Sequence, residues 1–453
     1  MRGPAVRPTG RLSGEKSSSG TGAAPGLTPP GRAVAVASVV VMGQGYVGLP
    51  LAVRAAEAGH HVIGFDVDGE RARRLAAGES FVGDVTSQRL RAALGTGRYR
   101  PTASAAELPG FDVGIIAVPT PLKAGAPDLA DVAAAARTLG ERLRPGACVV
   151  LESTTYPGTT EEVVGPILEQ VSGLRVGRDF HLGYSPERID PGNAAWDIAT
   201  TPKPVSGVDA ASLQSVQCFY DTIVDQTVAV SGTREAELAK LIENTFRAVN
   251  VALVNEIATF ARDLDVDIWE SIEVAATKPF GFMRFDPGPG VGGHCLPVDA
   301  GYLSWRVRER SGRPLRLVDT ANDINGRMPG YVVGRLTAAL HERGIEVEGS
   351  RILLLGLAYK EESGDTRESP AVAVAEALVA LRADVSAADP HVDGGVEVAG
   401  VRRVELGPEE ISDVDAVVLL TAHRAFDLDL VASRASLVFD ARGRLRGPNI
   451  ERL

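Results

Sequence analysis

Cys295 is the side chain in this sequence whose type and setting best suit nucleophilic chemistry. It follows a glycine-rich run and a histidine, and Asp299 lies four residues after it in the segment PGPGVGGHCLPVD. Glycine tolerates positive φ and the close approach of a ligand, so we expect this segment to be a loop that presents the sulfur. A lone cysteine in an intracellular chain is more often a small buried apolar residue, so the thiol does not by itself establish catalysis. The four glycines of the run are Gly288, Gly290, Gly292 and Gly293.

A long amphipathic stretch upstream carries a lysine and an asparagine on one face. Apolar residues recur at helical spacing from about Thr233 to Asp263 without an intervening glycine or proline, which predicts a helix of roughly 30 residues. Lys240, Asn244 and Arg247 stand at i, i+4 and i+7 of this helix. A solvated polar face is the alternative. A helix of this length suits a spine between two domains or pairing with a second copy. Its apolar positions are Leu238, Leu241, Ile242, Phe246, Val249, Leu253, Ile257 and Phe260.

The N-terminal part of the chain carries a dinucleotide-binding signature. A β-branched run at residues 37–42 predicts a buried strand, and the glycine turn GQGYVG follows it directly. A helical stretch to about Ala58 and a second strand at 61–65 complete a βαβ unit that ends on Asp66. This order of elements predicts a dinucleotide site. The residues expected to contact the cofactor from this signature are Gly43, Gly45, Tyr46, Val47, Gly48 and Asp66.

The residues after the second strand bear on the type of cofactor. Asp66 is placed to accept hydrogen bonds from ribose hydroxyls, and its charge repels the 2′-phosphate of NADP. NAD is therefore the expected cofactor. Arg71, which we also place near the cofactor, and Arg73 follow closely, so the spacing leaves NADP open.

Two further strands end in threonines. The runs at 112–118 and 148–152 predict buried strands that are followed by Thr120 and Thr154. The carboxyl ends of parallel strands form the ligand crevice of such a sheet, so both threonines are placed where nicotinamide and substrate meet. Turn formation is the alternative role for each of them.

A loop near the end of this unit adds two charged groups. Glu187 and Arg188 follow a further short apolar stretch in the segment YSPER. They supply a carboxylate and a guanidinium to the same region. A surface ion pair is the alternative.

A second α/β unit is expected after a polar connection at Gly326–Gly330 and a further helix. It starts near Ser350, and its first turn has one glycine, Gly356, which makes it a poor dinucleotide site. Lys360 and Arg367 lie in the polar segment that follows and suit a phosphate ligand. The expected elements are a strand at 351–355, a helix at 370–381 and strands at 416–420 and 437–439.

Length and charge limit the classes of function. A chain of 453 residues is long enough for roughly two to four domains, and its 44% apolar and 23% charged residues are typical of a soluble globular protein. A net charge of −11 argues against nucleic acid or an anionic membrane as the main partner. We therefore expect anionic ligands to be held by local donors.

Cysteine usage and the N-terminal composition indicate the setting. Three scattered cysteines form neither a disulfide framework nor a zinc site, so no metal is expected and a reducing, cytoplasmic location is favoured. The longest apolar run, residues 33–42, is too short to span a bilayer. The expected domains are a disordered tail at 1–36, an NAD-binding Rossmann domain at 37–230, a central helical domain with the cysteine loop at 231–335, and a second α/β domain at 336–453 that carries the candidate phosphate-binding residues.

Six segments, in order, resemble the signatures of one enzyme family. They are GQGYVGLP, ESTTYPGTT, YSPERIDPGN, ELAKLIENTFRAVN, PGPGVGGHCLPVD and GLAYKEESGDTRESP. Through them the chain resembles the UDP-glucose/GDP-mannose dehydrogenases, the nucleotide-sugar 6-dehydrogenases, over about residues 37–445. The resemblance implies an α/β fold with an N-terminal Rossmann domain, a central long-helix domain and a C-terminal Rossmann-like UDP-binding domain. It also implies that a UDP-sugar C6 alcohol is oxidised to a carboxylate by two hydride transfers to NAD.

The resemblance assigns roles to individual residues. Cys295 matches the nucleophile that forms a thiohemiacetal and then a thioester. Lys240 and Asn244 match the groups that stabilise the developing alkoxide. Asp299 and Thr154 match groups that position the water, and Glu187 matches the carboxylate that assists thioester hydrolysis. Substrate contacts are implied for Glu187, Arg188, Lys240, Asn244, Arg247, Gly292 and Lys360. Contacts with the cofactor or the uridine diphosphate are implied for Thr120, Arg367 and Arg442.

The identity of the sugar depends on details of the cysteine segment. Val298 stands where UDP-glucose dehydrogenases commonly have a lysine, so the chain looks more like the branch acting on UDP-N-acetylhexosamines, UDP-GlcNAc or UDP-ManNAc. Ala300 and Arg284 depart from prolines that are usual in that branch. A UDP-glucose dehydrogenase, a two-electron β-hydroxyacid dehydrogenase, and a non-catalytic nucleotide-sugar-binding or redox-sensing protein are the alternatives. A homodimer or higher oligomer through the central helix is expected.

Overall fold

The structure is a computed structural model that describes residues 36–189, 196–293, 295–392 and 398–453. The side chain of Cys295 lies outside this description, and so does the expected N-terminal tail apart from Val36.

The first part of the chain forms an eight-stranded sheet with the order β10-β9-β8-β7-β4-β1-β2-β3. Neighbouring strands are parallel except for β8 and β9. The strand order reverses at β1: β2 and β3 lie on one side of it, and the chain then crosses back to place β4 on the other side, which creates the switch point where such sheets bind ligands. The strands are β1 (Ser38–Met42), β2 (His61–Phe65), β3 (Tyr99–Thr102), β4 (Val113–Ile116), β7 (Cys148–Leu151), β8 (His181–Tyr184), β9 (Lys203–Gly207) and β10 (Thr227–Ala229).

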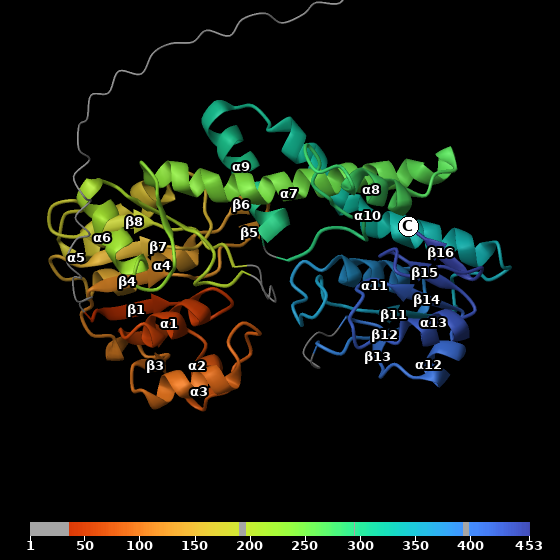
Figure 1. Ribbon diagram of the computed structural model, residues 1–453, viewed down its shortest axis with the longest axis horizontal. Helices are drawn as coiled ribbons and strands as arrows, with labels where there is room; N and C mark the ends of the chain where they lie inside the picture. The colour runs from red at the N-terminus through yellow and green to blue at the C-terminus, as the bar shows by residue number, and fades with distance from the viewer. Residues whose placement is uncertain (1–35, 190–195, 294, 393–397) are drawn as a thin grey trace, which may run out of the picture. The chain divides into compact units, whose positions relative to one another are not determined.

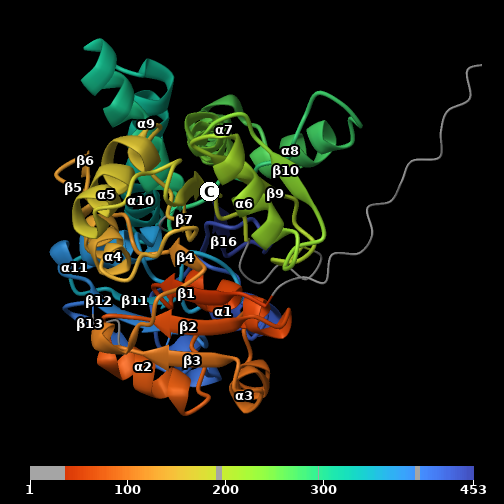
Figure 2. The same ribbon diagram turned by 90° about the vertical axis from the view of Figure 1, so that its left-hand side faces the viewer.

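The central strands are uniformly apolar because both faces of the sheet are covered. Val39 and Val41 belong to the apolar core on one face, and Val40 and Met42 to the core on the other. Figures 1 and 2 show the helices on the two faces, with α1 and α4 on opposite sides of the strands. The helices of this part are α1 (Gly48–Glu57), α2 (Gly69–Ala76), α3 (Ser87–Gly95), α4 (Ala130–Gly140), α5 (Gly165–Ser172) and α6 (Ala210–Tyr220). Smaller elements are the hairpin β5 (Leu122–Lys123) and β6 (Ala126–Pro127), the 3₁₀ helix at Ala105–Glu107 and the π-helical turn at Thr160–Val164.

The central part is built on α7 (Thr233–Ala261), a helix of 29 residues that packs against α9 (Cys295–Ser311) and α10 (Arg316–His341). It continues into a 3₁₀ turn at Arg262–Leu264 and is followed by α8 (Ile268–Ala276). The long helix expected from the periodicity is therefore present (Figure 1).

Two expectations for the central part are wrong. Cys295 does not stand within a loop, because α9 begins at this residue; Pro297 fits the first turn of a helix, where its missing N–H needs no partner. The polar connection expected at Gly326–Gly330 is also absent, since α10 runs through it with Pro329 inside. Packing of α10 against α7 and α11 (Pro370–Ala380) outweighs the low helix propensity of these residues.

The last part of the chain is a second doubly wound sheet, with the order β13-β12-β11-β14-β15-β16 and all neighbours parallel. Ile352 and Leu354 face one core while Leu353 and Leu355 face the other. The expected two Rossmann-like units with long helices between them are confirmed. The strands are β11 (Arg351–Leu355), β12 (Asp384–Ala388), β13 (Val401–Arg403), β14 (Ala416–Leu419), β15 (Val438–Asp440) and β16 (Ile450–Arg452), and the remaining helices are α12 (Pro408–Ser412) and α13 (Leu428–Arg434).

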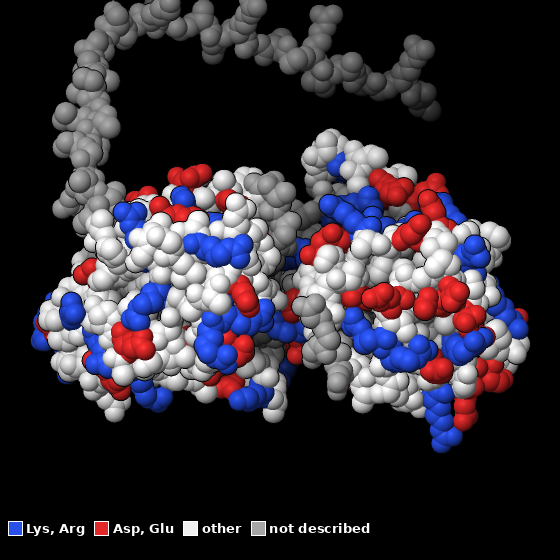
Figure 3. Space-filling model, turned by 90° about the horizontal axis from the view of Figure 1, so that it is seen from below, with Lys and Arg blue, Asp and Glu red and all other residues white. Residues whose placement is uncertain are grey.

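The surface is mixed in charge. On the face shown in Figure 3, basic and acidic side chains are interspersed. Within the described residues, no helix is both long enough and apolar enough to span a bilayer.

Candidate functional site

Lys240, Asn244 and Asp299 come together where α7 packs on α9. All three are buried, with 7%, 4% and 1% of their surface exposed. The side-chain amide of Asn244 donates a hydrogen bond to Asp299 Oδ2. Burial raises the pKa of Asp299 to about 7, although the charge of Lys240 and the hydrogen bond from Asn244 both act to lower it. The structure thus brings together a cation, an amide donor and a carboxyl group that titrates near neutral pH.

This trio has the chemistry needed for oxidation of an alcohol. Lys240 and Asn244 supply N–H donors for an oxygen that develops negative charge, and they act more strongly here than in water because they are buried. Asp299, with its pKa near 7, can both take up and release a proton at neutral pH. Arg247 does not join them, since it is exposed; the expected polar face of α7 is therefore split between a buried pair and an exposed arginine.

Cys295 stands one helical turn before Asp299. The two residues are at i and i+4 of α9, so they share one face of that helix. Cys295 is also the first residue of the helix, the end at which the helix dipole favours negative charge.

The glycine run before Cys295 passes close to the second sheet unit. Gly290 has φ +132° and Gly293 has φ +78°, as expected. Gly288 and Gly292 do not have positive φ, which corrects the expectation for them. Gly292 is required for space instead, because a Cβ placed there lies 2.6 Å from Tyr359 Cβ. The segment therefore packs closely against Tyr359, the residue before Lys360.

The turn after β1 has the shape of a dinucleotide site. Gly43 has φ +90°, and a Cβ on Gly48 would lie 1.9 Å from the Gly43 carbonyl oxygen, so both must be glycine. A Cβ on Gly45 would meet nothing within 4 Å, which leaves room for a pyrophosphate beside the backbone. NAD fits this turn, and Tyr46 and Val47 lie within it.

Asp66 and Arg71 form a pair at the end of β2. Asp66 Oδ2 accepts a hydrogen bond from Gln44 N at 2.8 Å and from Arg71 Nη1 at 3.0 Å, and its Oδ1 accepts from Asp68 N at 3.0 Å. The Asp66 carboxylate pairs with the Arg71 guanidinium and so offsets its positive charge. This arrangement favours a ribose hydroxyl over a 2′-phosphate as the neighbouring group of the cofactor. The acceptor role predicted for Asp66 remains a prediction.

Thr120 and Thr154 follow the carboxyl ends of β4 and β7, as the sequence predicts for the crevice. Thr120 is buried, and its carbonyl accepts a hydrogen bond from the hydroxyl of Tyr302 at 3.0 Å, whereas Thr154 is half-buried. Tyr302 lies on α9, so this hydrogen bond joins the helix that begins at Cys295 to the eight-stranded sheet unit. Sequence reasoning missed this tyrosine, since nothing local marks a contact across 182 residues.

Glu187 and Arg188 are both half-buried beside α7. Arg188 Nε donates to Glu243 on α7 at 3.0 Å, and its Nη1 donates to the Pro202 carbonyl at 2.9 Å. These contacts join the loop after β8 to α7 and to the residue before β9. Glu187 accepts a hydrogen bond from Ile189 N. Its expected role in catalysis stays a prediction.

A buried ion pair behind Glu187 was also missed by sequence reasoning. Lys203 Nζ lies 2.6 Å from Glu152 Oε1, and the Lys203 ammonium also donates to the Pro186 carbonyl at 3.3 Å. Tyr220 donates to the same Glu152 oxygen. Burial raises the pKa of Glu152, which Lys203 opposes. These contacts fix the backbone just before Glu187.

The second sheet unit supplies three cationic candidates. Arg367 forms a bidentate pair with Asp365, and its guanidinium lies 4.9 Å from the centre of the Tyr46 ring in the glycine turn. Arg442 donates from Nε to the Leu420 carbonyl, and its Nη1 is 3.0 Å from the position of a Cβ on Gly288. Burial lowers the pKa of Arg442 to about 10, so it remains charged at neutral pH. Lys360 is half-buried next to Tyr359.

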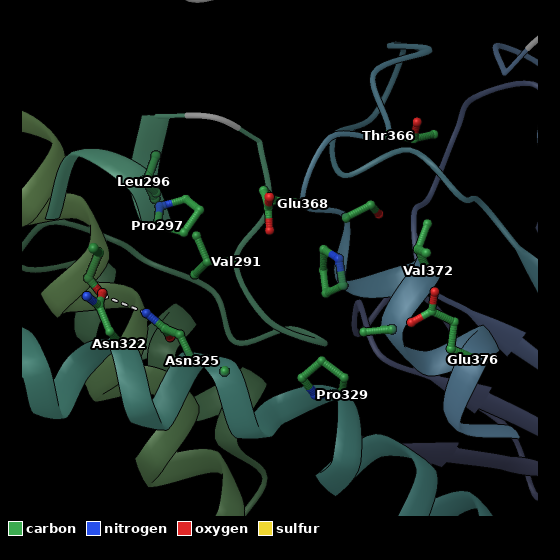
Figure 4. Close-up of a pocket in the computed structure, with 15 residues that line it drawn as sticks. Val291, Leu296, Pro297, Asn322, Asn325, Pro329, Thr366, Glu368, Val372 and Glu376 are labelled. Atoms are coloured by element: carbon green, nitrogen blue, oxygen red, sulfur yellow. Dashed lines mark hydrogen bonds between the residues drawn. The ribbon is translucent and has the colours of Figure 1, made fainter. Parts of the chain in front are cut away.

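A cavity of about 480 Å³ lies beside the cysteine segment, as Figure 4 shows. Glu368 and Glu376 line it, and neither lysine nor arginine is among its lining residues, so a diphosphate does not fit there. It is distinct from the Lys240 trio.

Comparison with known proteins identifies the family. The chain matches the UDP-glucose/GDP-mannose dehydrogenase family in three consecutive parts: the NAD binding domain over residues 37–224, the central domain over 234–327 and the UDP binding domain over 353–447. It is 36% identical over 390 residues to a UDP-N-acetyl-D-glucosamine 6-dehydrogenase from Pseudomonas aeruginosa, covering 86% of this chain and 91% of that protein.

Two solved structures have the same architecture. The UDP-D-ManNAc dehydrogenase from Pyrococcus horikoshii matches with a TM-score of 0.83 at 33% identity, over 92% of this chain and 98% of that one. A UDP-glucose dehydrogenase from Pyrobaculum islandicum matches with a TM-score of 0.83 at 30% identity, over 94% and 98%. The chain belongs to the UDP-glucose/GDP-mannose dehydrogenase family and is an NAD-dependent nucleotide-sugar dehydrogenase.

Proposed function

We propose that this enzyme oxidises the C6 alcohol of a UDP-N-acetylhexosamine to the carboxylate, with Cys295 as the nucleophile. The observation that carries the proposal is the pairing of α7 with α9. Lys240 and Asn244 on one helix meet Asp299 on the other, one turn after Cys295. NAD, when bound at the glycine turn, accepts one hydride in each of two oxidations.

In the first oxidation the C6 hydroxyl loses its proton as the C6 hydride departs. Asp299 in its ionised form takes up that proton through water, and the donors of Lys240 and Asn244 stabilise the developing alkoxide. The product is an aldehyde that stays bound.

In the second oxidation the Cys295 thiolate adds to the aldehyde carbon. The resulting thiohemiacetal alkoxide faces the same Lys240 and Asn244 donors, and loss of a second hydride leaves a thioester. A water positioned by Asp299 and Thr154, with Glu187 assisting, then attacks the thioester carbonyl and releases the carboxylate and the thiol. The sum is one alcohol and one water converted to one acid by loss of two hydrides and their protons.

The acetamido sugar is favoured by the cysteine segment and by the relatives. Val298 replaces the lysine that is common in UDP-glucose dehydrogenases, and it is buried against Tyr302 rather than facing a ligand. The relative from Pseudomonas aeruginosa and the structure from Pyrococcus horikoshii are named for UDP-N-acetylhexosamines. The structure from Pyrobaculum islandicum is named for UDP-glucose, which is the alternative substrate.

The test is an NADH assay over UDP-GlcNAc, UDP-ManNAc, UDP-glucose and GDP-mannose. We expect two NADH per sugar consumed, with the highest kcat/KM on a UDP-N-acetylhexosamine. One NADH per sugar with release of an aldehyde or ketone would assign a two-electron dehydrogenase. No NADH with any of these sugars would favour a binding or sensing protein.

Cys295→Ser tests the nucleophile directly. The variant should form no acid and no covalent sugar adduct by mass spectrometry, because a serine hydroxyl is not ionised at neutral pH. Cys218→Ser, an exposed cysteine distant in sequence, is the matched control and should retain activity. An unchanged rate in Cys295→Ser would place the chemistry elsewhere.

We further propose that two copies of the chain associate through α7 in the cytoplasm. The inward face of α7 is made of small or polar residues such as Ala248, Ala252 and Asn255, while a row of large apolar side chains is left exposed. Such a row is the expected signature of a covered face. It comprises Ile242, Phe246, Leu253, Ile257 and Phe260.

A further inference from the structure

We propose that Asn255 and Asn325 are positioning residues that anchor the cysteine segment to α7 and α10 and thereby fix where Cys295 stands. The inference rests on the proposed function, in which Cys295 must reach the bound aldehyde. Neither asparagine belongs to the Lys240 trio.

The two side chains form a continuous chain of hydrogen bonds. The Gly288 amide donates to Asn255 Oδ1 at 2.9 Å, Asn255 Nδ2 donates to Asn325 Oδ1 at 2.9 Å, and Asn325 Nδ2 donates to the Ala248 carbonyl at 3.0 Å. Asn255 is fully buried and Asn325 is 7% exposed. The chain starts at the first glycine of the cysteine segment and ends on the backbone of α7.

The direction of these bonds is fixed at both ends. A backbone amide can only donate and a backbone carbonyl can only accept, so Gly288 and Ala248 set the orientation of both side-chain amides. Turning either amide over would put a donor against a donor or an acceptor against an acceptor in a buried site. Only one orientation of the two side-chain amides satisfies the network. In that orientation Asn255 Oδ1 holds the Gly288 amide in place.

Pro329 lies beside this anchor point. As a proline within α10 it has no N–H to offer the Asn325 carbonyl four residues before it. A Cβ on Gly290 would lie 3.2 Å from that carbonyl oxygen and 3.5 Å from Pro329 Cδ. The cysteine segment thus crosses α10 at the position where one backbone hydrogen bond of the helix is missing. Gly290, which has no side chain, permits this close approach.

The segment also borders a cavity beside the asparagine chain. The cavity of about 480 Å³ is lined by Val291, Leu296 and Pro297, which precede and follow Cys295, as well as by Asn325 (Figure 4). Nearer to Cys295 the segment is held by the second sheet unit, where Gly293 N donates to the Arg367 carbonyl at 2.9 Å. The asparagine chain is thus the anchor at the Gly288 end of the segment.

The expected kinetic effect follows from the order of the steps. The first hydride transfer needs no thiol, whereas formation and hydrolysis of the thioester do. Loosening the segment should therefore lower the NADH yield per sugar from two towards one and release aldehyde, with KM little changed.

The experiment compares Asn255→Leu, Asn325→Leu and the double variant with a control, Asn250→Leu, in the full-length enzyme. Asn250 also lies on α7, but it bonds within the helix, to the Phe246 carbonyl at 2.7 Å. The double variant removes both partners of the Asn255–Asn325 hydrogen bond, whereas each single variant leaves one buried side-chain amide without that partner.

Amide hydrogen exchange at Gly288 is the first measurement. Pro287 and Pro289 have no amide proton, so exchange in this short segment reports on Gly288 and Gly290. Loss of one net hydrogen bond should speed exchange at Gly288 by about tenfold in Asn255→Leu and in the double variant. The control should exchange at the wild-type rate.

Alkylation of Cys295 by iodoacetamide is the second measurement, followed by mass spectrometry without substrate. The rate should change severalfold in the variants but not in the control. Wild-type exchange and wild-type alkylation in a folded double variant would overturn the proposal. If the double variant does not fold, Asn255→Asp decides: it keeps an acceptor for Gly288 but loses the donor to Asn325, and unchanged alkylation would overturn the inference.

The two proposals fail in different ways. If wild-type enzyme yields no NADH from any nucleotide sugar, the proposed function is wrong, yet exchange and alkylation still report whether the asparagines anchor the segment. If wild type yields two NADH and the variants do so at the same rate, the proposed function stands and the positioning role is wrong.

Discussion

Asp299 shows how burial changes the titration of a carboxyl group. Its pKa is raised to about 7 because water is excluded, and neither Lys240 nor Asn244 fully offsets this. The same burial makes Asp299 costly to ionise in the folded protein. As pH rises and Asp299 ionises, we therefore expect kcat to increase and the contribution of Asp299 to the stability of the fold to decrease.

For catalysis, Asp299→Asn should lower kcat roughly 100-fold or more, because the variant cannot accept a proton. In wild type, kcat should rise with pH through about 7 as Asp299 ionises. The measurement is a pH–rate profile under saturating substrate. A variant that keeps the wild-type profile would show that the ionisation belongs to another group.

For stability, the folded pKa near 7 lies above the ordinary value of 3.8, so the folded state binds the proton more tightly. The contribution of Asp299 to the unfolding free energy should therefore fall as pH rises from about 4 to about 7 and then stay level. The full shift corresponds to at most about 4 kcal/mol. Asp299→Asn has no such cost, so its melting temperature relative to wild type should be higher at pH 8 than at pH 5. An equal difference at both pH values would contradict the raised pKa.

At the scale of elements, α7 has two faces of different composition. Its inward face holds the Lys240 and Asn244 donors and the Asn255 anchor, and small residues there let α9 and α10 approach closely. Its outward face leaves a row of large apolar side chains exposed. The periodicity that predicts the helix therefore marks the surface we assign to association, while the inner face is mostly small or polar.

Phe246→Glu combined with Leu253→Glu should convert the assembly to monomers, because two carboxylates would be buried without partners. Light scattering after size-exclusion chromatography measures the mass. The control is Leu317→Glu with Leu381→Glu, which introduces the same charges at exposed leucines outside α7 and should leave the mass unchanged. A dimer that survives the α7 pair would place the interface elsewhere.

At the scale of the whole molecule, a polar segment of the second sheet unit contacts the glycine turn of the first. Arg367 belongs to the second unit, yet its guanidinium lies over Tyr46 in the glycine turn of the first. Lys360, seven residues earlier, is next to Tyr359, which packs on the cysteine segment. One polar segment thus contacts both the glycine turn and the cysteine segment.

Arg367→Ala and Lys360→Ala should separate these roles. We expect Arg367→Ala to raise the KM for NAD about tenfold or more with a smaller effect on the sugar nucleotide, and Lys360→Ala to do the reverse. Initial rates with each substrate varied in turn measure the split. Equal effects of both variants on both KM values would contradict the assignment.

The sequence alone determined the local features. The glycine turn between a buried strand and a helix, the long helix from Thr233 and the apolar strands of the second unit all follow from short-range periodicity and backbone sterics, and the structure contains them. Cys295, Lys240, Asn244 and Asp299 were marked by residue type and by segments that resemble one family. Each of these signals is local: Lys240 and Asn244 are four residues apart, and so are Cys295 and Asp299.

The tertiary structure decided what depends on distant contacts. It placed Asn244 against Asp299 while leaving Arg247 exposed, paired Arg188 with Glu243, and carried α10 through Pro329. It also joined Asn255 to Asn325 across 70 residues. No local pattern encodes such partners, because burial and packing of side chains far apart in sequence fix which donor meets which acceptor and which ionisable group loses its water.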